Sequence, residues 1–338
     1  MTTLTAPAPP GIRRPAVPWA RLAWVTWRQH RAGLAGVAAL FAGLGLLLLV
    51  NGLAMRGSLA SLGLNACHPV SAPRCATQLS IFDSDYAIWR NTVPALLQVL
   101  PALIGVFTGG PLLARELESG TFRFAWTQGA GRTRWVLAKL ILLAVPVTGA
   151  AAAFSLLFSW WYQPFLAEGS SLMAPVIFDL SGSVFAAWAL AGFAVGAFAG
   201  IAIRRIVPAM AAALAGWAGL AVTTALYLRP AYQAPLVARL VRQGQYLIPA
   251  RSYVTSAWWI SPDGRPMSSS AVSSLIQRLE RQGLNPKAWV IQHHYGQGIT
   301  YQPESRFWPF QLIEGGWLLA LALVLGAATV WLVRRRAA

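Results

Sequence analysis

Side chains able to form ion pairs or to dock a partner are concentrated in one short stretch of this chain, Ala114–Lys139. It reads ARELESGTFRFAWTQGAGRTRWVLAK and holds two carboxylates among five basic residues, which are Arg115, Arg123, Arg132, Arg134 and Lys139. Mixed charges at this density suit charge-assisted hydrogen bonds, either within the stretch or with a partner. Phe122, Phe124 and Trp126 suit a bilayer surface or the groove of a partner protein. The stretch therefore predicts a docking loop, and the alternative is a solvated hairpin tip without a partner.

Catalytic and metal-binding motifs are missing from the sequence. The two lysines, Lys139 and Lys287, stand in A-K-L and P-K-A, so no G-x-x-x-x-G-K-[ST] phosphate loop exists and the chain is not expected to be an ATPase. No H-E-x-x-H or G-x-S-x-G sequence occurs, and His293–His294 has no partner set for a metal ion. We therefore predict no catalytic residue, no metal site and no cofactor bound by this chain itself.

Two long uncharged apolar runs, Thr92–Ala114 and Leu140–Ala167, flank the loop and must position it. Each can cross a hydrocarbon layer of about 30 Å as a helix of about 20 residues. A polar segment between two spans lies in water, and its five basic residues predict the cytoplasmic side. Ser119–Gly120 predicts the end of the incoming helix. Thr121 is a candidate N-cap of a short helix within the loop, and Thr133 of the outgoing span.

The order of charged and small residues in this loop resembles that of a known family. The pattern is R-E-x-E-x-G-T, then R-x-R-W and K after about ten residues, and its members are Arg115, Glu116, Glu118, Gly120, Thr121, Arg132, Arg134 and Lys139. It is similar to the cytoplasmic loop of type-2 ABC exporter permeases, the membrane subunits of drug, antibiotic and polysaccharide exporters. In that family the loop forms a coupling helix that docks on a separate ATPase subunit.

The resemblance implies a role in ATPase coupling for nine residues, which are Arg115, Glu116, Glu118, Gly120, Thr121, Phe122, Trp126, Arg132 and Arg134. It implies that ATP and magnesium are bound by a partner ATPase, and that a second permease subunit completes a homodimer or heterodimer. Arginine outnumbers lysine by 25 to 2, which is typical of a GC-rich bacterial genome and favours an actinobacterial-like member. The implied location is the bacterial plasma membrane.

Composition supports the membrane class independently of the motif. Of the 338 residues, 56% are hydrophobic and only 11% are charged, against about 25% in soluble proteins. The net charge of +17 is spread over the loops. We therefore interpret the basic residues as determinants of orientation and contacts to lipid headgroups, and we exclude nucleic acid as a partner.

The predicted fold is an all-α integral membrane protein with six transmembrane helices and both termini in the cytoplasm. The predicted spans are Ala32–Ala54, Thr92–Ala114, Leu140–Tyr162, Leu180–Ile203, Ile206–Leu228 and Gly315–Val333. The termini and short loops assigned to the cytoplasm hold 15 basic residues, against three in the short external loops (Arg56, Arg74 and Arg90). This asymmetry is the reason for the predicted orientation.

The predicted domains follow from these spans. Residues 1–31 form a cytoplasmic tail and an amphipathic elbow helix, Trp19–Arg31, for which a simple basic anchor is the alternative. Residues 32–228 hold five spans, with an external loop at 55–91 and the coupling loop at 115–139. Residues 229–309 form a long external insertion with a helix near Ser268–Gln282. Residues 310–338 hold the sixth span and a basic tail.

Two further sets of residues have predicted structural roles. Cys67 and Cys75 are the only cysteines and lie in the predicted external loop, so a disulfide is expected, with two free thiols as the alternative. Gly192, Gly196 and Gly200 form a stripe on the fourth span that permits close approach of another helix. This partner is either a helix of the same subunit or, alternatively, a dimer seam or a transport pathway.

Ionisable groups are almost missing from the predicted spans. Asp179 and Glu314 come closest, and both are expected to cap helix starts near the outer face, with a role in substrate release as the alternative. A carrier driven by protons or sodium needs such groups at mid-bilayer, so the driving force is expected from a separate ATPase.

We therefore predict a membrane-spanning permease subunit of an ATP-driven exporter. The alternatives are a membrane-anchored receptor or scaffold that binds a ligand through 229–309, and a membrane-embedded enzyme acting on lipid.

Overall fold

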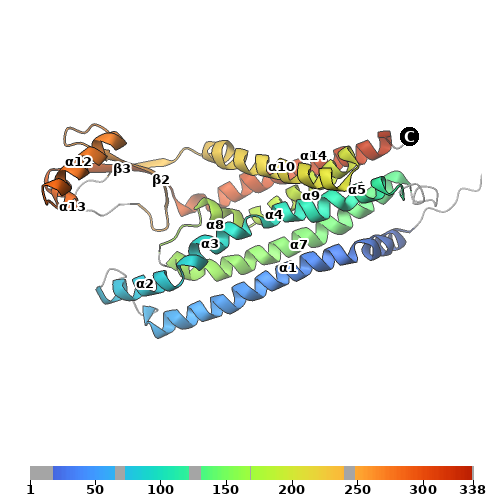
Figure 1. Ribbon diagram of the computed structural model, residues 1–338, viewed down its shortest axis with the longest axis horizontal. Coiled ribbons are helices and arrows are strands. Elements are labelled where there is room, and N and C mark those ends of the chain that lie inside the picture. The colour runs from blue at the N-terminus through green and yellow to red at the C-terminus, as the bar shows by residue number, and fades with distance from the viewer. Residues whose placement is uncertain (1–17, 65–72, 122–130, 168, 240–247, 337–338) are drawn as a thin grey trace, which may run out of the picture.

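The structure is a computed structural model of the chain, and it describes residues 18–64, 73–121, 131–167, 169–239 and 248–336. Within these described residues, six helical segments are long and apolar enough to cross a membrane, and they are Trp19–Ser61, Ala87–Glu118, Arg132–Ala167, Val184–Ile203, Ile206–Tyr232 and Glu304–Arg335. Each overlaps one predicted span, so the prediction of six spans is confirmed. The helices form an elongated bundle, and a unit that contains strands lies beyond one of its ends (Figure 1).

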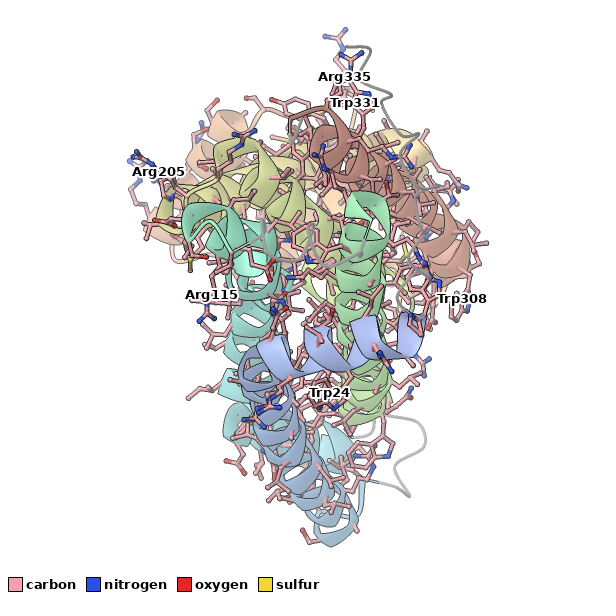
Figure 2. The ribbon with its side chains drawn as sticks, turned by 90° about the vertical axis from the view of Figure 1, so that its right-hand side faces the viewer. Trp24, Arg115, Arg205, Trp308, Trp331 and Arg335 are labelled. Carbon is pink, nitrogen blue, oxygen red and sulfur yellow. The ribbon has the colours of Figure 1, made fainter. Side chains whose placement is uncertain are left out.

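Helices α1 (Trp19–Ser61) and α7 (Arg132–Ala167) pack side by side along the bundle. The residues predicted as a separate elbow helix are the first turns of α1, because no proline interrupts the helix after Pro18. These turns carry Trp24 and run crosswise to the rest of α1 (Figure 2).

The second span is divided into four pieces: α3 (Ala87–Leu97), α4 (Leu100–Ile104), a π-helical turn (Gly105–Gly109) and α5 (Gly110–Glu118). The helix is interrupted at Gln98 and Val99, and Pro101 is the second residue of α4. Proline lacks an N–H group and disfavours helical geometry in the residue before it. The missing N–H of Pro101 accounts for this interruption.

Helix α9 (Val184–Ile203) is the central helix of the bundle and contacts α4, α5, α7, α10 and α14. A short helix, α8 (Pro175–Leu180), precedes it. The fifth span comprises α10 (Ile206–Thr223), a π-helical turn (Thr224–Leu228) and α11 (Arg229–Tyr232). The sixth is α14 (Phe307–Arg336), and it begins eight residues before the predicted Gly315.

The predicted all-α fold is wrong in the insertion between α11 and α14. Strands β1 (Leu236–Arg239), β3 (Gly296–Gln302) and β2 (Tyr253–Ile260) form an antiparallel sheet in the order β1-β3-β2. The sequence of β2, YVTSAWWI, is rich in β-branched and aromatic residues, which favour strands. In the sheet, Trp258 lies opposite Gly298 and its ring occupies the space a side chain there would need.

Helix α12 (Ser269–Arg281) and helix α13 (Pro286–Gln292) accompany this sheet. The prediction of a helix near Ser268–Gln282 is confirmed, and Ser268 Oγ accepts a hydrogen bond from the backbone N–H of Ala271 at 3.2 Å. At the same end of the bundle, α2 (Pro73–Asp85) follows α1. Cys75 in α2 is buried and disulfide-bonded, and Cys67 lies outside the described residues.

Candidate functional site

The two ends of the loop after α5 meet in a buried ion pair. Lys139 lies two turns inside α7, is 1% exposed, and its Nζ donates a hydrogen bond to Glu116 Oε1 in α5. The ammonium also lies 4.7 Å from the centre of the Trp135 ring. The sequence counted Lys139 among the loop cations, which is wrong, because α7 begins at Arg132 and carries the lysine into the bundle. The pair therefore joins the second span to the third.

Glu118 joins the second span to the fifth. Its Oε2 accepts a hydrogen bond from the backbone N–H of Ile206, the first residue of α10, at 2.9 Å. The first N–H groups of a helix lack partners within the helix and carry partial positive charge, so a carboxylate is favoured there. The preceding turn brings Ile206 within reach, because Arg204 adopts a left-handed conformation with a φ of 62°.

The turn that ends α5 agrees with the sequence prediction. The helix ends at Glu118, and Gly120 has a φ of 72°, which favours glycine. The side chains of Ser119 and Thr121 share a hydrogen bond of 2.9 Å. Phe122 and Trp126 lie outside the described residues, and so does the short helix that Thr121 was expected to cap.

The far stem of the loop contacts two more spans. Thr133 was expected to cap α7, but it lies inside the first turn, and its Oγ1 accepts a hydrogen bond from Arg334 Nε of α14 at 3.0 Å. The guanidinium of Arg134 lies 5.0 Å from the ring of Trp19 in α1. Arg132 is half-buried at the start of α7, and Arg115 is exposed. At this end of the bundle, Arg115, Arg205 and Arg335 project outward (Figure 2).

The glycine stripe on α9 packs against the second span of the same chain. A Cβ atom on Gly192 would lie 2.5 Å from the carbonyl oxygen of Pro101, and one on Gly200 would lie 2.6 Å from that of Gly110. A Cβ on Gly196, between them, would contact the backbone of Gly109 and Gly110 at 2.9 Å and 2.7 Å. These glycines allow direct backbone contact between α9 and the segment that leads to the loop.

A second cluster of charges lies near the opposite end of the spans. Arg229 donates from Nε to Glu314 Oε2 at 2.9 Å and from Nη2 to Glu314 Oε1 at 2.6 Å, and Nη2 also binds Asp179. Trp188 Nε1 donates to Glu314 Oε1 at 3.0 Å, and Gln98 Nε2 donates to Asp179 Oδ2 at 2.8 Å. These hydrogen bonds therefore connect five separate segments of the chain, three of which supply the two carboxylates and the guanidinium.

A family model described as ABC-2 membrane transporter related matches residues 38–229, more than half of the chain. The chain belongs to this family. It is thus an ABC-2 type permease, and the resemblance seen in the loop is confirmed. No curated protein and no solved structure matches the chain. The match begins within the first span and ends near the end of the fifth, and it includes the loop and the glycine stripe. The sheet of the insertion and α14 lie beyond it.

Sequence reasoning missed the charge cluster of this permease. Asp179 and Glu314 were each expected to cap a helix start, which is wrong: Asp179 lies near the end of α8, Glu314 lies in the second turn of α14, and both bind Arg229. The available signal was Arg229 itself, which directly follows the fifth span. A cation at that depth requires a carboxylate partner, and these two are the acidic residues nearest to the same level.

Asp179 makes the stability of the permease dependent on pH. Burial, opposed by Arg229 and assisted by Glu314, raises the pKa of this carboxyl from its ordinary 3.8 to about 6. A raised pKa means that the folded state binds the proton more tightly than the unfolded chain, so folding is favoured as the pH falls through 6. The free energy of unfolding of the wild type, relative to Asp179→Asn, should be about 1 kcal/mol higher at pH 5 than at pH 7.5. Thermal melting of both proteins at the two pH values measures this effect. If the wild type and Asp179→Asn differed in stability by the same amount at both pH values, the raised pKa of Asp179 would be contradicted.

Proposed function

We propose that this permease is a subunit of an ATP-driven exporter and that a separate ATPase docks on residues 115–135. Membership in the family and six apolar helices establish a membrane subunit of the transporter type. The ATPase partner, the direction of transport and a second permease subunit in the complex belong to the proposal. The basic residues of the loop and of the termini favour the cytoplasm for this end of the bundle.

The main support is the way in which the ends of the loop are connected. Glu116–Lys139 joins α5 to α7, Glu118 joins α5 to α10, Thr133–Arg334 joins α7 to α14, and Arg134–Trp19 joins α7 to α1. A displacement of the loop by a partner would therefore be transmitted to five helices at once. In this mechanism, closure of two ATPases on ATP moves the loops and rocks the two permease subunits as rigid bodies.

The experiment compares variants at the two ends of the bundle. Arg115→Glu combined with Phe122→Asp changes an exposed cation and an aromatic residue of the loop without touching the ion pair of its stems. Loss of an interface anchor costs more than about 1.4 kcal/mol, so stimulation of the ATPase should fall roughly tenfold or more. Arg278→Glu on the exposed surface of α12 makes the same charge change in the insertion and should leave stimulation unchanged.

The measurement is ATP hydrolysis by candidate ABC ATPases reconstituted with the permease in lipid nanodiscs. Co-purification in mild detergent with the same ATPases reports docking directly. Full stimulation by the loop variant would contradict docking on 115–135. Failure of every candidate ATPase to bind the wild type would move the assignment to a receptor or scaffold.

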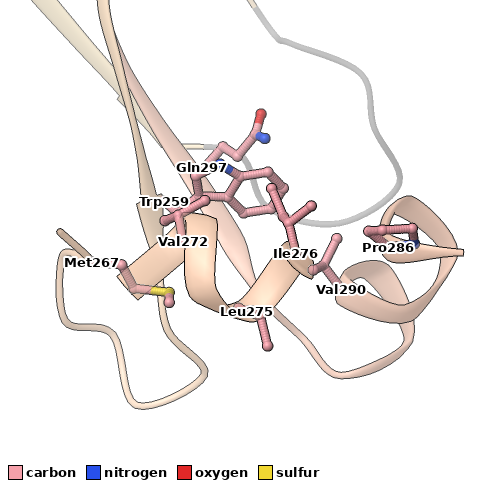
Figure 3. Close-up of a pocket in the computed structure, with 8 residues that line it drawn as sticks. All are labelled: Trp259, Met267, Val272, Leu275, Ile276, Pro286, Val290 and Gln297. Carbon is pink, nitrogen blue, oxygen red and sulfur yellow. The ribbon is translucent and has the colours of Figure 1, made fainter. Parts of the chain in front are cut away.

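One observation favours that second function. The insertion contains an apolar hollow of about 340 Å³ between β2 and helices α12 and α13 (Figure 3). Trp259, Leu275, Ile276 and Val290 line it, together with the amide side chain of Gln297. Hollows of this size and character accept small apolar ligands. A receptor would therefore bind its ligand here, and Ile276→Trp would abolish that binding.

A further inference from the structure

A separate pocket of about 300 Å³ lies between the second and fifth spans of the permease. Its walls include the aromatic residues Phe185 and Trp188 from α9 and Trp217 from α10. Its polar lining comes from Gln98, Asp179 and Arg229. The pocket thus combines an apolar body with one small charged region, which is the usual composition of a ligand site.

The charges around the pocket do not balance. Arg229 supplies one positive charge, whereas Glu314 and Asp179 supply two negative charges when both are ionised. Glu314 is 0% exposed and accepts hydrogen bonds from Arg229, Trp188 and Tyr232. Asp179 is 25% exposed, lines the pocket and shares the Nη2 group of Arg229 with Glu314. The ionised cluster therefore lacks one positive charge, and the deficit lies at Asp179.

The aromatic walls also suit a cation. The rings of Trp188 and Trp217 meet edge to face with their centres 6.0 Å apart. Tryptophan attracts cations placed over its ring more strongly than the other aromatic residues do. Within the part of the chain that the structure describes, the buried Nε1 of Trp217 has no hydrogen-bond partner. An acceptor oxygen on a bound molecule would satisfy this donor.

We propose that this pocket binds an apolar molecule that carries a protonated amine and, close to it, an acceptor oxygen. The ammonium group pairs with Asp179, the apolar part lies against Trp188 and Trp217, and the oxygen accepts the Nε1–H of Trp217. The inference does not depend on whether an ATPase docks on the loop. The same chemistry has two sources, the headgroup of an aminophospholipid and a free organic cation.

The first arm of the test uses a free cation. Full-length permease in phosphatidylcholine nanodiscs is titrated with an N-dodecyl amino alcohol, and uncharged dodecanol serves as the matched probe. We expect one saturable equivalent of the amine at pH 7.5, at least tenfold weaker binding by Asp179→Asn, and no competition by dodecanol. Asp263→Asn, an exposed carboxylate of the insertion, should bind as the wild type does. Equal binding by Asp179→Asn, or equal affinity for dodecanol, would overturn the proposal.

The second arm identifies the source. Native mass spectrometry of permease extracted from membranes should show retained phosphatidylethanolamine if the natural occupant is a lipid, and an empty pocket that takes only the added amine if it is a free cation. Retention of phosphatidylglycerol in place of either would overturn the proposal, because that headgroup carries no amine.

Two further measurements distinguish binding of the amine by Asp179 from a purely structural role of this residue. Binding of the amine should weaken as the pH falls below about 6, because burial raises the pKa of Asp179 to about 6. The charged or polar neighbours of Asp179 are Arg229, Glu314 and Gln98, and Tyr232 binds Glu314. Ala225→Phe fills the pocket from an exposed position and leaves every charge in place. It should abolish binding without changing the melting temperature. Binding that persists in this variant would contradict the assigned pocket.

Discussion

Replacing Glu116 with glutamine should destabilise the permease by about 3 kcal/mol, one of the largest effects expected of any single substitution. The reason is the position of Lys139, which is 1% exposed and has Glu116 as its carboxylate partner. Removal of the carboxylate leaves a charged ammonium inside the bundle, and the Trp135 ring beside it compensates only in part. Replacement of both residues, as Glu116→Gln with Lys139→Met, removes the charge and should recover most of the loss.

A double-mutant cycle of melting or denaturant transitions in detergent measures this coupling. Glu280→Gln on the exposed surface of α12 is the matched control, and it should change stability by less than about 0.5 kcal/mol. Additive single effects would show that the two side chains do not interact.

Exchange of the two side chains, Glu116→Lys with Lys139→Glu, then distinguishes a stem contact from a docking contact. If the pair holds the stems together, the exchange should restore both stability and stimulation of the ATPase. If Glu116 instead contacts the ATPase directly, stability should recover while stimulation stays low.

Replacing Gly196 with alanine should also have a large effect, costing about 1–3 kcal/mol or more. The added Cβ would contact backbone atoms of Gly105, Gly109 and Gly110 in the second span. Backbone cannot rotate away as a side chain can, so α9 and α5 would have to separate. Since α5 leads into the loop, the variant should also weaken coupling.

Gly219→Ala provides the control for this prediction. Gly219 lies in α10, and a Cβ there would meet nothing within 4 Å among the described atoms. Alanine is favoured over glycine in helices by about 1 kcal/mol, so this variant should be neutral or slightly stabilising. Unfolding of the two alanine variants in bicelles measures the difference. Equal stability of both would mean that α9 and the second span are not in backbone contact.

Local signals in the sequence were sufficient for most of the helical framework. Apolar runs of about 20 residues predicted the six spans because each run must bury its own backbone polar groups in a helix. Gly120 predicted the end of α5, and Ser268 predicted the start of α12, because both are local backbone effects. The pattern of charges around Gly120, together with the predicted spans on both sides of it, indicated the family.

The sheet of the insertion could be recognised only from the tertiary structure. The central strand β3, GQGITYQ, has two glycines and two glutamines and does not have the composition of a strand. It becomes the middle strand because β1 and β2 pair with its two edges. Strand formation depends on partners that are distant in sequence, so composition alone predicted too much helix.

Which charged side chains pair with one another was likewise decided only by the packing of the helices. The sequence placed Glu116, Glu118 and Lys139 in one charged loop, but it could not show that Lys139 is buried, or that Glu118 reaches the start of α10. Asp179 and Glu314 are separated from Arg229 by 50 and 85 residues, and no periodic pattern connects them. A membrane span depends on the properties of consecutive residues, so the sequence predicts it. The partner of a buried charge depends on which opposite charge the packed helices place beside it, so only the tertiary structure shows it.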